Sequence, residues 1–199
     1  EIYCEQDRQE AGRWLQLNHP EITEAELEHR LGRYGLNPCG EILGADFHCN
    51  LAEVHLNRLD PDDLEGQSDA FRAAGLSVAC LLNHRFEVER YRQSRAWDPI
   101  VGVSFTGLFD FFVHAFGTAW LEWWAAGRPE TAEGLAFKEQ EAAYLSRWKT
   151  TVNEAVWDYC DRHGLRRPNR CTTVQPAGTK SLLTGAAPGW HPPKAQRFI

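Results

Sequence analysis

Apolar residues recur at helical spacing in several stretches of the chain, and turn-forming residues separate these stretches. The first stretch covers residues 5–17 and ends at Asn18-His19-Pro20. The second is predicted to begin at Thr23, whose hydroxyl can cap the first turn while Glu26 reaches back to complete a capping box. Gly35 suits the position just past the end of this helix, because glycine adopts the left-handed conformation that ends many helices.

Another helix is predicted after Asp60-Pro61-Asp62-Asp63, over about residues 67–83. Asp60 can act as the N-cap and Pro61 can take the first helical position, with the acidic residues close to the positive helix end. Residues 75–82 are apolar nearly all round the predicted helix, which indicates a buried element. Cys80 lies in this stretch and is expected to be a packing residue.

One run has the pattern of a strand that is buried on both faces. Residues 99–105, with the sequence PIVGVSF, form a short and nearly continuous apolar run that is rich in β-branched residues. Such runs are typical of parallel or barrel sheets. A helix over residues 108–116 follows it, and residues 170–174 are a second strand candidate. Because strands alternate with long helices, we predict an α/β fold.

The last long helix is predicted from Pro129-Glu130-Thr131 to about His163, and a tryptophan cluster precedes it. Trp120, Trp123 and Trp124 could stack on a cofactor or pack in a core, and core packing is the more frequent use of such clusters. The polar face of the long helix is interpreted as solvated surface; it carries Lys138, Glu139, Glu141, Arg147 and Lys149.

Composition narrows the functional classes. The 199 residues carry 21 basic and 28 acidic side chains, a net charge of −7, which argues against a general nucleic-acid or membrane-surface binder. No run approaches the roughly 20 apolar residues of a membrane span, and no signal peptide is recognisable. The six cysteines include no C-x-x-C pair, so we expect reduced cysteines in a cytoplasmic protein.

The richest candidate for chemistry is a turn that carries Asn37, Cys39 and Glu41, with Pro38 and Gly40 on either side of the cysteine. The nearby carboxylate disfavours a thiolate, so the turn suits a neutral thiol better than a classical cysteine nucleophile. Hydrogen-atom chemistry on a polyol would use such a set, because the amide can bind hydroxyls and the carboxylate can take a proton. An ordinary turn with an incidental cysteine is the alternative.

Two further features could belong to the same site. Cys49 follows Cys39 by ten residues and could serve redox chemistry, a metal site with His48, or neither. Residues 176–181, with the sequence PAGTKS, offer the small side chains and backbone N–H groups that a phosphate needs. They do not form the Walker pattern of nucleotide hydrolases, and an ordinary turn is the alternative here as well.

Three motifs, in this order along the chain, resemble the large subunits of ribonucleotide reductases. More narrowly, they resemble the adenosylcobalamin-dependent (class II) ribonucleoside-triphosphate reductases of bacteria. The motifs are NPCGEI at residues 37–42 followed by CNL at 49–51, DPIVGVSFTGL at 98–108, and PAGTKSLL at 176–183 followed by PGWHP at 188–192. Three motifs in the same order are far more specific than any one of them.

The resemblance implies a fold. Residues 1–199 would be a helix-rich part of the catalytic barrel domain, a partial ten-stranded α/β barrel. A central cysteine finger loop, at about residues 36–50, would pass through this barrel. A phosphate-type loop would occupy about residues 175–185.

The resemblance also implies roles for particular residues. Cys39 matches the residue that becomes a thiyl radical and takes the 3′-hydrogen of the ribose. Glu41 matches the general base on the 3′-hydroxyl, and Asn37 matches the amide that hydrogen-bonds the ribose hydroxyls. Cys49 matches one of the two cysteines that reduce the substrate and end as a disulfide. The loop that binds the substrate phosphates is matched by Ala177, Gly178, Thr179, Lys180 and Ser181.

The implied function is reduction of a ribonucleoside triphosphate to a deoxyribonucleotide for DNA synthesis. The cofactor would be adenosylcobalamin, the vitamin B12 coenzyme, and the reductant would be thioredoxin-like. The remaining portions of the same enzyme would be partners, whereas no nucleic acid, membrane or metal ligand is implied. A piece of a reductase that takes its radical from a separate metal subunit is the alternative within the family. A structural protein with a metal clip of Cys39, Cys49 and His48 is the alternative outside it.

The chain also departs from the family pattern. The partner of Cys49 comes from an upstream barrel strand in the family, and Cys4 lies too close to the loop to take its place. The effector-binding region, the last barrel strands and the mobile C-terminal cysteine pair have no counterpart. Because the chain also contains no methionine, we expect it to be an internal piece of a longer enzyme and to be inactive alone.

Overall fold

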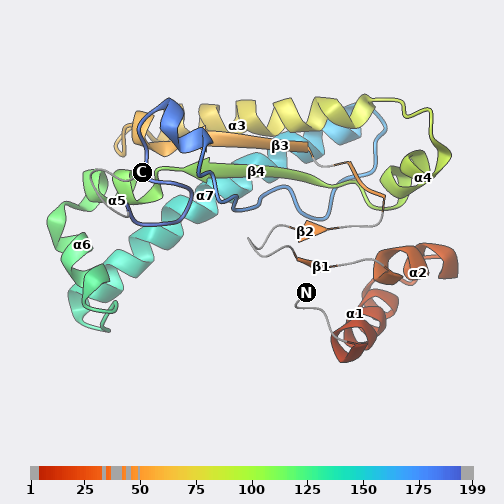
Figure 1. Ribbon diagram of the computed structural model, residues 1–199, viewed down its shortest axis with the longest axis horizontal. Coiled ribbons are helices and arrows are strands. Elements are labelled where there is room, and N and C mark those ends of the chain that lie inside the picture. Colours follow the sequence, from red (N-terminus) through yellow and green to blue (C-terminus); the bar gives the residue numbers. More distant parts are fainter. Residues whose placement is uncertain (1–4, 33–34, 37–41, 44–45, 49, 194–199) are drawn as a thin grey trace.

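The computed structural model describes residues 5–32, 35–36, 42–43, 46–48 and 50–193. Helices predominate in this part of the chain (Figure 1). The α-helices are α1 (Glu5–Asn18), α2 (Glu24–Gly32), α3 (Leu64–Cys80), α4 (Glu89–Trp97), α5 (Leu108–Phe116), α6 (Thr118–Ala125) and α7 (Ala132–Arg162). The strands are β1 (Gly35–Leu36), β2 (Ile42–Leu43), β3 (Asn50–His55) and β4 (Val101–Thr106), and short 3₁₀ turns cover Leu56–Arg58, Leu81–Asn83 and Lys180–Leu183.

The centre of the fold is a parallel pair of strands. β3 lies beside β4 over six residue pairs, from Asn50 opposite Val101 to His55 opposite Thr106. A third segment extends the sheet on the other side of β4: the Val103 N–H donates to the Cys171 carbonyl at 2.9 Å, and the Thr173 N–H donates to the Val103 carbonyl at 3.0 Å. The strand predicted at residues 170–174 therefore exists only as a single bridge, between Val103 and Thr172.

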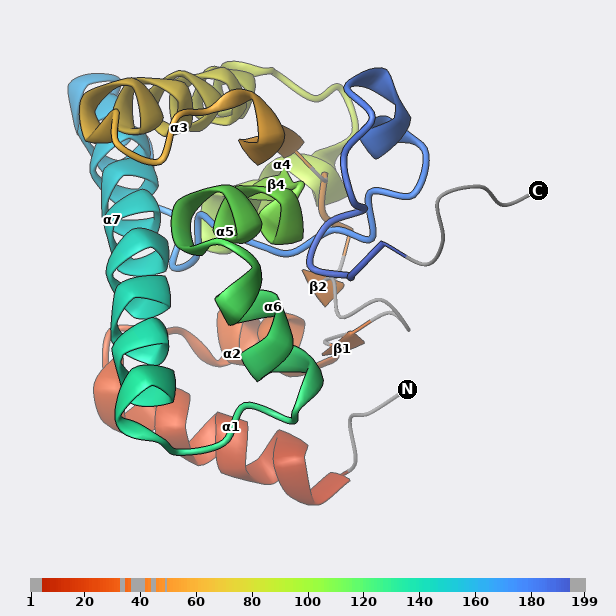
Figure 2. The same ribbon diagram turned by 90° about the vertical axis from the view of Figure 1, so that its left-hand side faces the viewer.

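The β3–β4 sheet has two chemically different faces. Side chains alternate along a strand, so Val54, Val103 and Phe105 share one face, where they are buried in the hydrophobic core with α3 and α7. The other face carries two in-register pairs, Glu53 opposite Ser104 and His55 opposite Thr106. Figure 2 shows α3 and α7 on one side of the sheet and the blue segment after α7 on the other. All six residues of β4 are buried, as predicted, but only one face is apolar.

Aromatic side chains fill the space between α5, α6 and α7. Trp120 is 2% exposed and Trp123 is 7% exposed, and Trp120 packs edge-on against Phe109 at 5.2 Å between ring centroids. Trp148 of α7 contacts Phe111 in the same way at 5.2 Å. The tryptophan cluster is therefore core packing, the use that the sequence favoured.

Two predictions about α3 were wrong. Asp63, rather than Asp60, caps the helix, because its carboxylate accepts the Gly66 N–H at 2.8 Å. Asp60 instead accepts the Asp62 N–H at 2.9 Å, a local turn that precedes the helix. Cys80 is exposed in the structure and not buried, because α3 packs on the sheet and on α7 through one face only.

α7 runs without interruption over 31 residues, close to its predicted length, and Gly164 follows it with a left-handed φ of 62°. Its polar face is not uniformly solvated, because Glu141 is buried. The Glu141 carboxylate accepts the Trp120 indole N–H at 2.7 Å and an Arg128 N–H at 2.6 Å. Among the described residues, no helix is both long and apolar enough to cross a membrane.

We expect Glu141→Ala to destabilise the fold by about 2–4 kcal/mol, because the substitution leaves a buried indole N–H and an arginine without their acceptor. The measurement is the free energy of unfolding in urea. Glu139→Ala is the matched control on the same helix: Glu139 is exposed, so its loss should change stability by no more than about 0.5 kcal/mol. Equal stabilities of the two variants would contradict the structural role of Glu141.

Candidate functional site

The predicted residues Asn37, Cys39, Glu41 and Cys49 lie outside the described part of the chain, so their roles stay predictions. The structure does describe what flanks them. β1 and β2 pair in antiparallel fashion, with Gly35 opposite Leu43 and Leu36 opposite Ile42, so the residues on either side of segment 37–41 are neighbours. β1 and β2 lie on the side of β4 that faces away from α3 (Figure 1).

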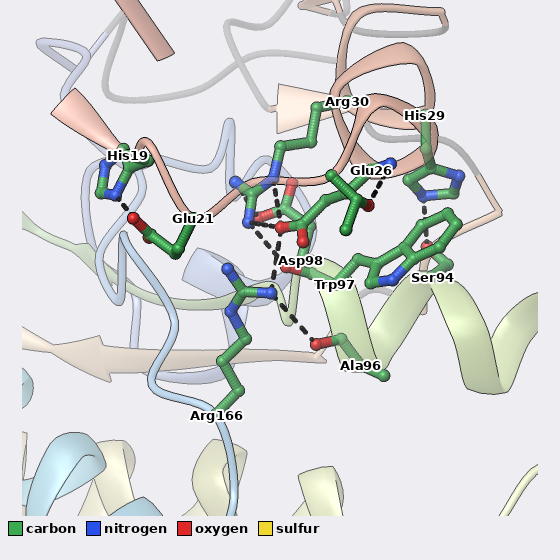
Figure 3. Close-up of polar contacts among 11 residues, drawn as sticks. His19, Glu21, Glu26, His29, Arg30, Ser94, Ala96, Trp97, Asp98 and Arg166 are labelled. Atoms are coloured by element: carbon green, nitrogen blue, oxygen red, sulfur yellow. Dashed lines mark hydrogen bonds and ion pairs between the residues drawn. The ribbon is translucent and has the colours of Figure 1, made fainter. Parts of the chain in front are cut away.

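A buried arginine ties α2, which precedes this segment, to the start of β4 (Figure 3). The Arg30 side chain is 7% exposed and forms an ion pair with Glu26, with 2.9 Å between Nη2 and Oε1. It forms a second ion pair with Asp98, with 3.2 Å between Nη1 and Oδ1. Nη2 also donates to the Trp97 carbonyl at 2.6 Å. One guanidinium thus joins α2 to the residues that enter the central sheet.

Neighbouring contacts support the same junction. His29 packs edge-on against Trp97 at 5.1 Å and hydrogen-bonds the Ser94 hydroxyl at 3.2 Å. Arg166, from the segment after α7, approaches Glu26 at 2.9 Å. The predicted capping box is therefore only half formed: Thr23 Oγ1 accepts the Glu26 N–H at 3.2 Å, but the Glu26 carboxylate turns to the arginines instead of reaching back.

Asp98 is held in this network under two opposing influences. Burial raises the pKa of its carboxyl group above the ordinary value of 3.8, and the nearby Arg30 and Arg166 partly offset the increase. A buried carboxylate is stable here only because the guanidinium of Arg30 is fixed against it. Loss of Arg30 would therefore leave the Asp98 carboxylate without the cation with which it forms its ion pair.

The predicted phosphate-type loop crosses the polar face of the sheet. Gln175, which is 3% exposed, is fixed there because its backbone N–H donates to Ser104 Oγ at 2.9 Å. Ala177 has a left-handed φ of 55°, and the Ser181 N–H donates to the Ala177 carbonyl at 3.0 Å, so the chain turns tightly at this point. Gly178, Thr179 and Lys180 are exposed, whereas Ala177 and Ser181 are buried. The five predicted loop residues thus form one turn, with its middle open to solvent.

Lys180 connects this loop to β3. Its ammonium group donates to Gln175 Oε1 and lies 3.1 Å from Glu53 Oε2. The Glu53 side chain is only 3% exposed, whereas that of Lys180 is 46% exposed. Within the described residues, neither Glu53 oxygen accepts a well-directed hydrogen bond, and Gln175 Nε2 has no hydrogen-bond partner. A buried carboxylate therefore depends on a half-exposed lysine for its charge compensation.

The end of β3 contacts the same segment. His55 Nδ1 lies 2.7 Å from Thr184 Oγ1, and this hydroxyl donates to Asn57 Oδ1 at 3.1 Å. Asn57 Nδ2 returns a hydrogen bond to the Thr184 carbonyl at 3.0 Å. These contacts place the loop at the carboxyl end of β3, the end at which parallel sheets usually bind ligands.

Sequence reasoning missed Glu53, Arg30 and Asp98. A signal for Glu53 was available, because an acidic residue between the apolar residues Ala52 and Val54 would mark a polar face if this stretch were a strand, but no strand was predicted across it. Arg30 and Asp98 are 68 residues apart, and no local pattern connects them. Two of the described cysteines are poor nucleophiles: burial raises the pKa of Cys171 to about 12 and also raises the pKa of Cys160.

Comparison with known proteins gives a consistent result. No protein-family model matches the chain. An adenosylcobalamin-dependent ribonucleoside-triphosphate reductase of Lacticaseibacillus paracasei is 29% identical and aligns with 86% of this chain and 25% of its own length. The enzyme of the same name from Levilactobacillus brevis is 28% identical over 79% of this chain and 22% of its own length.

A solved structure, described as a B12-dependent (class II) ribonucleotide reductase, has a similar fold. The TM-score is 0.57 with 24% sequence identity, and the match covers 79% of this chain and 22% of that one. The chain therefore spans about a quarter of the length of the curated relatives that it matches. The resemblance to part of an adenosylcobalamin-dependent reductase is confirmed, as is a helix-rich α/β fold.

We expect Arg30→Met to destabilise the protein by about 3 kcal/mol, because the substitution leaves the buried Asp98 carboxylate without its ion-pair partner and leaves Glu26 with Arg166 alone. Urea unfolding measures the loss, and amide hydrogen exchange should show faster opening of α2 than of α7. Arg13→Met on the neighbouring helix α1 is the matched control, since Arg13 is exposed. Unchanged protection of α2 in Arg30→Met would rule out this anchoring role.

A second expectation concerns pH. A carboxyl group whose pKa is raised by folding stabilises the folded state most below its unfolded pKa, and the contribution is lost as pH rises through the folded pKa. Asp98→Asn cannot titrate. We therefore expect the stability of the wild type relative to Asp98→Asn to fall from about pH 4 towards neutral pH. Urea unfolding of both proteins across this window measures the trend, and an increase would contradict it.

Proposed function

We propose that this chain forms part of the catalytic region of an adenosylcobalamin-dependent ribonucleoside-triphosphate reductase. The observation that carries the proposal is that the three motifs meet on one sheet. The first motif leads into β3, the second contains β4, and the third covers their polar face through Gln175 and Lys180. Similarity to the named reductases over most of the chain supports the same assignment.

The arrangement suits a nucleotide that lies along the polar face. Segment 37–41 is joined to the amino end of β3 through β2 and residues 46–48, while the phosphate-type loop contacts the carboxyl end at His55. In the proposed arrangement, the cysteine turn binds the ribose and Lys180 binds the phosphates of one nucleotide.

Each site residue then has one task. Cys39, as a thiyl radical, takes the 3′-hydrogen of the ribose, and Glu41 takes the proton of the 3′-hydroxyl as the 2′-hydroxyl leaves as water. Asn37 binds the ribose hydroxyls, and Cys49 supplies reducing equivalents together with a second cysteine. The loop of Ala177, Gly178, Thr179, Lys180 and Ser181 binds the phosphates. A neutral thiol beside an amide and an acid agrees with these tasks.

Adenosylcobalamin supplies a Co–C bond that breaks to generate the radical when the cofactor is bound. The described residues identify no contact to it, and we assign none. The other participants that we propose are a thioredoxin-like reductant and the remaining portions of the same enzyme. β3, β4 and segment 171–173 would be three neighbouring members of a ten-stranded barrel, with the polar face of the sheet turned to the barrel interior and the cysteine finger loop inside it.

The alternatives have less support. The relatives and the solved structure described above are all cobalamin-dependent by name, which favours this type over a reductase with a separate metal subunit. A metal clip of Cys39, Cys49 and His48 involves two residues outside the described part of the chain. Metal analysis distinguishes it: stoichiometric zinc that disappears in Cys39→Ser would favour the clip over the reductase.

We expect Cys39→Ala to abolish deoxynucleotide formation in the complete gene product that carries these residues. The assay contains a ribonucleoside triphosphate, effector, reductant and adenosylcobalamin. Cys80→Ala is the matched control, because Cys80 is an exposed thiol on α3 and should leave turnover unchanged. Product formation by Cys39→Ala at the wild-type rate would end the proposed radical role.

A further inference from the structure

The polar face of the β3–β4 sheet contains an ion pair that the proposed reaction does not itself require. Glu53 belongs to none of the groups that carry out the chemistry, yet it places a carboxylate in a site that is 97% shielded from solvent, since its side chain is 3% exposed. Burying a carboxylate costs several kcal/mol unless a cation and hydrogen bonds compensate it. The Glu53 carboxylate therefore needs compensation from neighbouring groups.

Compensation comes mainly from the phosphate-type loop. Lys180 Nζ lies 3.1 Å from Glu53 Oε2, while His55 Nε2 is more distant, at 4.0 Å from Oε1. Lys180 also donates to Gln175 Oε1. If the lysine swung out into solvent, the buried carboxylate would lose its nearest cation. The lysine is consequently held, although its side chain is 46% exposed and would otherwise sample many rotamers.

The holding groups are themselves fixed to the sheet. Glu53 is in the middle of β3, directly opposite Ser104 of β4, and Ser104 Oγ accepts the backbone N–H of Gln175 at 2.9 Å. Both residues that contact the lysine are therefore attached to the sheet through their backbone. The ammonium has three N–H groups, and one of them donates to Gln175 Oε1, while the Glu53 carboxylate is its counter-ion at 3.1 Å, so donor capacity remains for a ligand.

The cluster is also incompletely satisfied. Within the described residues, both Glu53 oxygens and Gln175 Nε2 are buried without hydrogen-bond partners. Buried polar groups without hydrogen-bond partners are uncommon in folded proteins. They lower stability and occur mainly at functional sites. Nε2 is bonded to the same carbon as the oxygen that accepts from Lys180, so an unused donor lies next to the ammonium.

We propose that Glu53 is a positioning residue, which together with Gln175 holds the Lys180 ammonium at the phosphate-type loop so that it meets a phosphate oxygen of the nucleotide. The inference rests on the proposed function, because it takes a nucleoside triphosphate as the ligand. Its physical basis is preorganisation: a lysine already held in place loses less conformational entropy when the phosphate binds. Glu53 does not touch the substrate.

The direction in which CTP affinity changes when Glu53 is replaced distinguishes two roles for this carboxylate. A carboxylate that merely neutralised Lys180 would weaken phosphate binding, so its removal would tighten binding. A positioning carboxylate has the opposite effect. We therefore expect Glu53→Gln to raise the Kd of CTP roughly tenfold, the equivalent of one charge-assisted hydrogen bond. The Kd of cytidine, which lacks phosphates, should stay within about twofold of the wild-type value.

The experiment is titration calorimetry on the complete gene product with CTP and with cytidine. Glu65→Gln on α3 is the matched control, because Glu65 is exposed and should leave both constants unchanged. Lys180→Met should weaken CTP binding as well, and the double variant Glu53→Gln/Lys180→Met should bind CTP no more weakly than Lys180→Met alone. Such non-additivity identifies two residues that act as one unit.

Several outcomes would overturn the inference. Tighter or unchanged CTP binding in Glu53→Gln would do so, as would equal weakening of CTP and cytidine, which indicates general damage to the fold. Additive effects of the two substitutions would also do so. If any of these occurs while Cys39→Ala abolishes turnover, the inference fails and the proposed function stands. If the wild type does not bind CTP, both fail.

Discussion

The parallel pairing of β3 with β4 is the constraint on which the other described features depend. Its register places apolar side chains such as Val54 and Phe105 on one face and polar side chains such as Glu53 and Ser104 on the other. The apolar face requires cover, and α3 and α7 provide it. The polar face cannot be covered by a hydrophobic helix, so an irregular segment rich in hydrogen-bonding groups crosses it instead. A one-residue shift in register would exchange the two faces.

Charged contacts attach the irregular parts to this sheet. Arg30 connects α2 to the entry of β4 through Asp98, and Lys180 connects the phosphate-type loop to the middle of β3 through Glu53. In both contacts the carboxylate is buried, and its charge is compensated by the cation of the partner residue. Hydrophobic contacts hold the helices without specifying which loop conformation is adopted. Buried ion pairs do specify it, because a displaced loop leaves an uncompensated charge.

The parts of the fold that could be predicted from the sequence are those set by local residue patterns. The helices α1 and α7 and the buried strand β4 follow from periodicity and end signals within a few residues, and all three were predicted close to their observed bounds. The cap of α3 was a local error, whereas other errors arose where tertiary contacts replaced local ones. Glu26 left its expected capping contact for two arginines, and Glu141 became buried because an indole N–H and Arg128 needed an acceptor. The candidate cysteine turn came from its motif alone, whereas the Glu53–Lys180 pair required the fold, since 127 residues separate its members.

The polar face also explains why an irregular segment, and not a helix, lies on this side of the six-residue strand pair. A sheet whose second face were apolar would be buried under a helix and closed to ligands. Here the Ser104 and Thr106 hydroxyls accept hydrogen bonds from the backbone N–H groups of Gln175 and Gly189. These bonds hold the irregular segment on the sheet. Gly189 has no Cβ, and one there would lie 2.5 Å from the Gln175 carbonyl oxygen, so only glycine allows the segment to fold back this closely. The loop that carries Lys180 is therefore set by backbone contacts to the sheet, and the charge of Glu53 then selects where its ammonium lies.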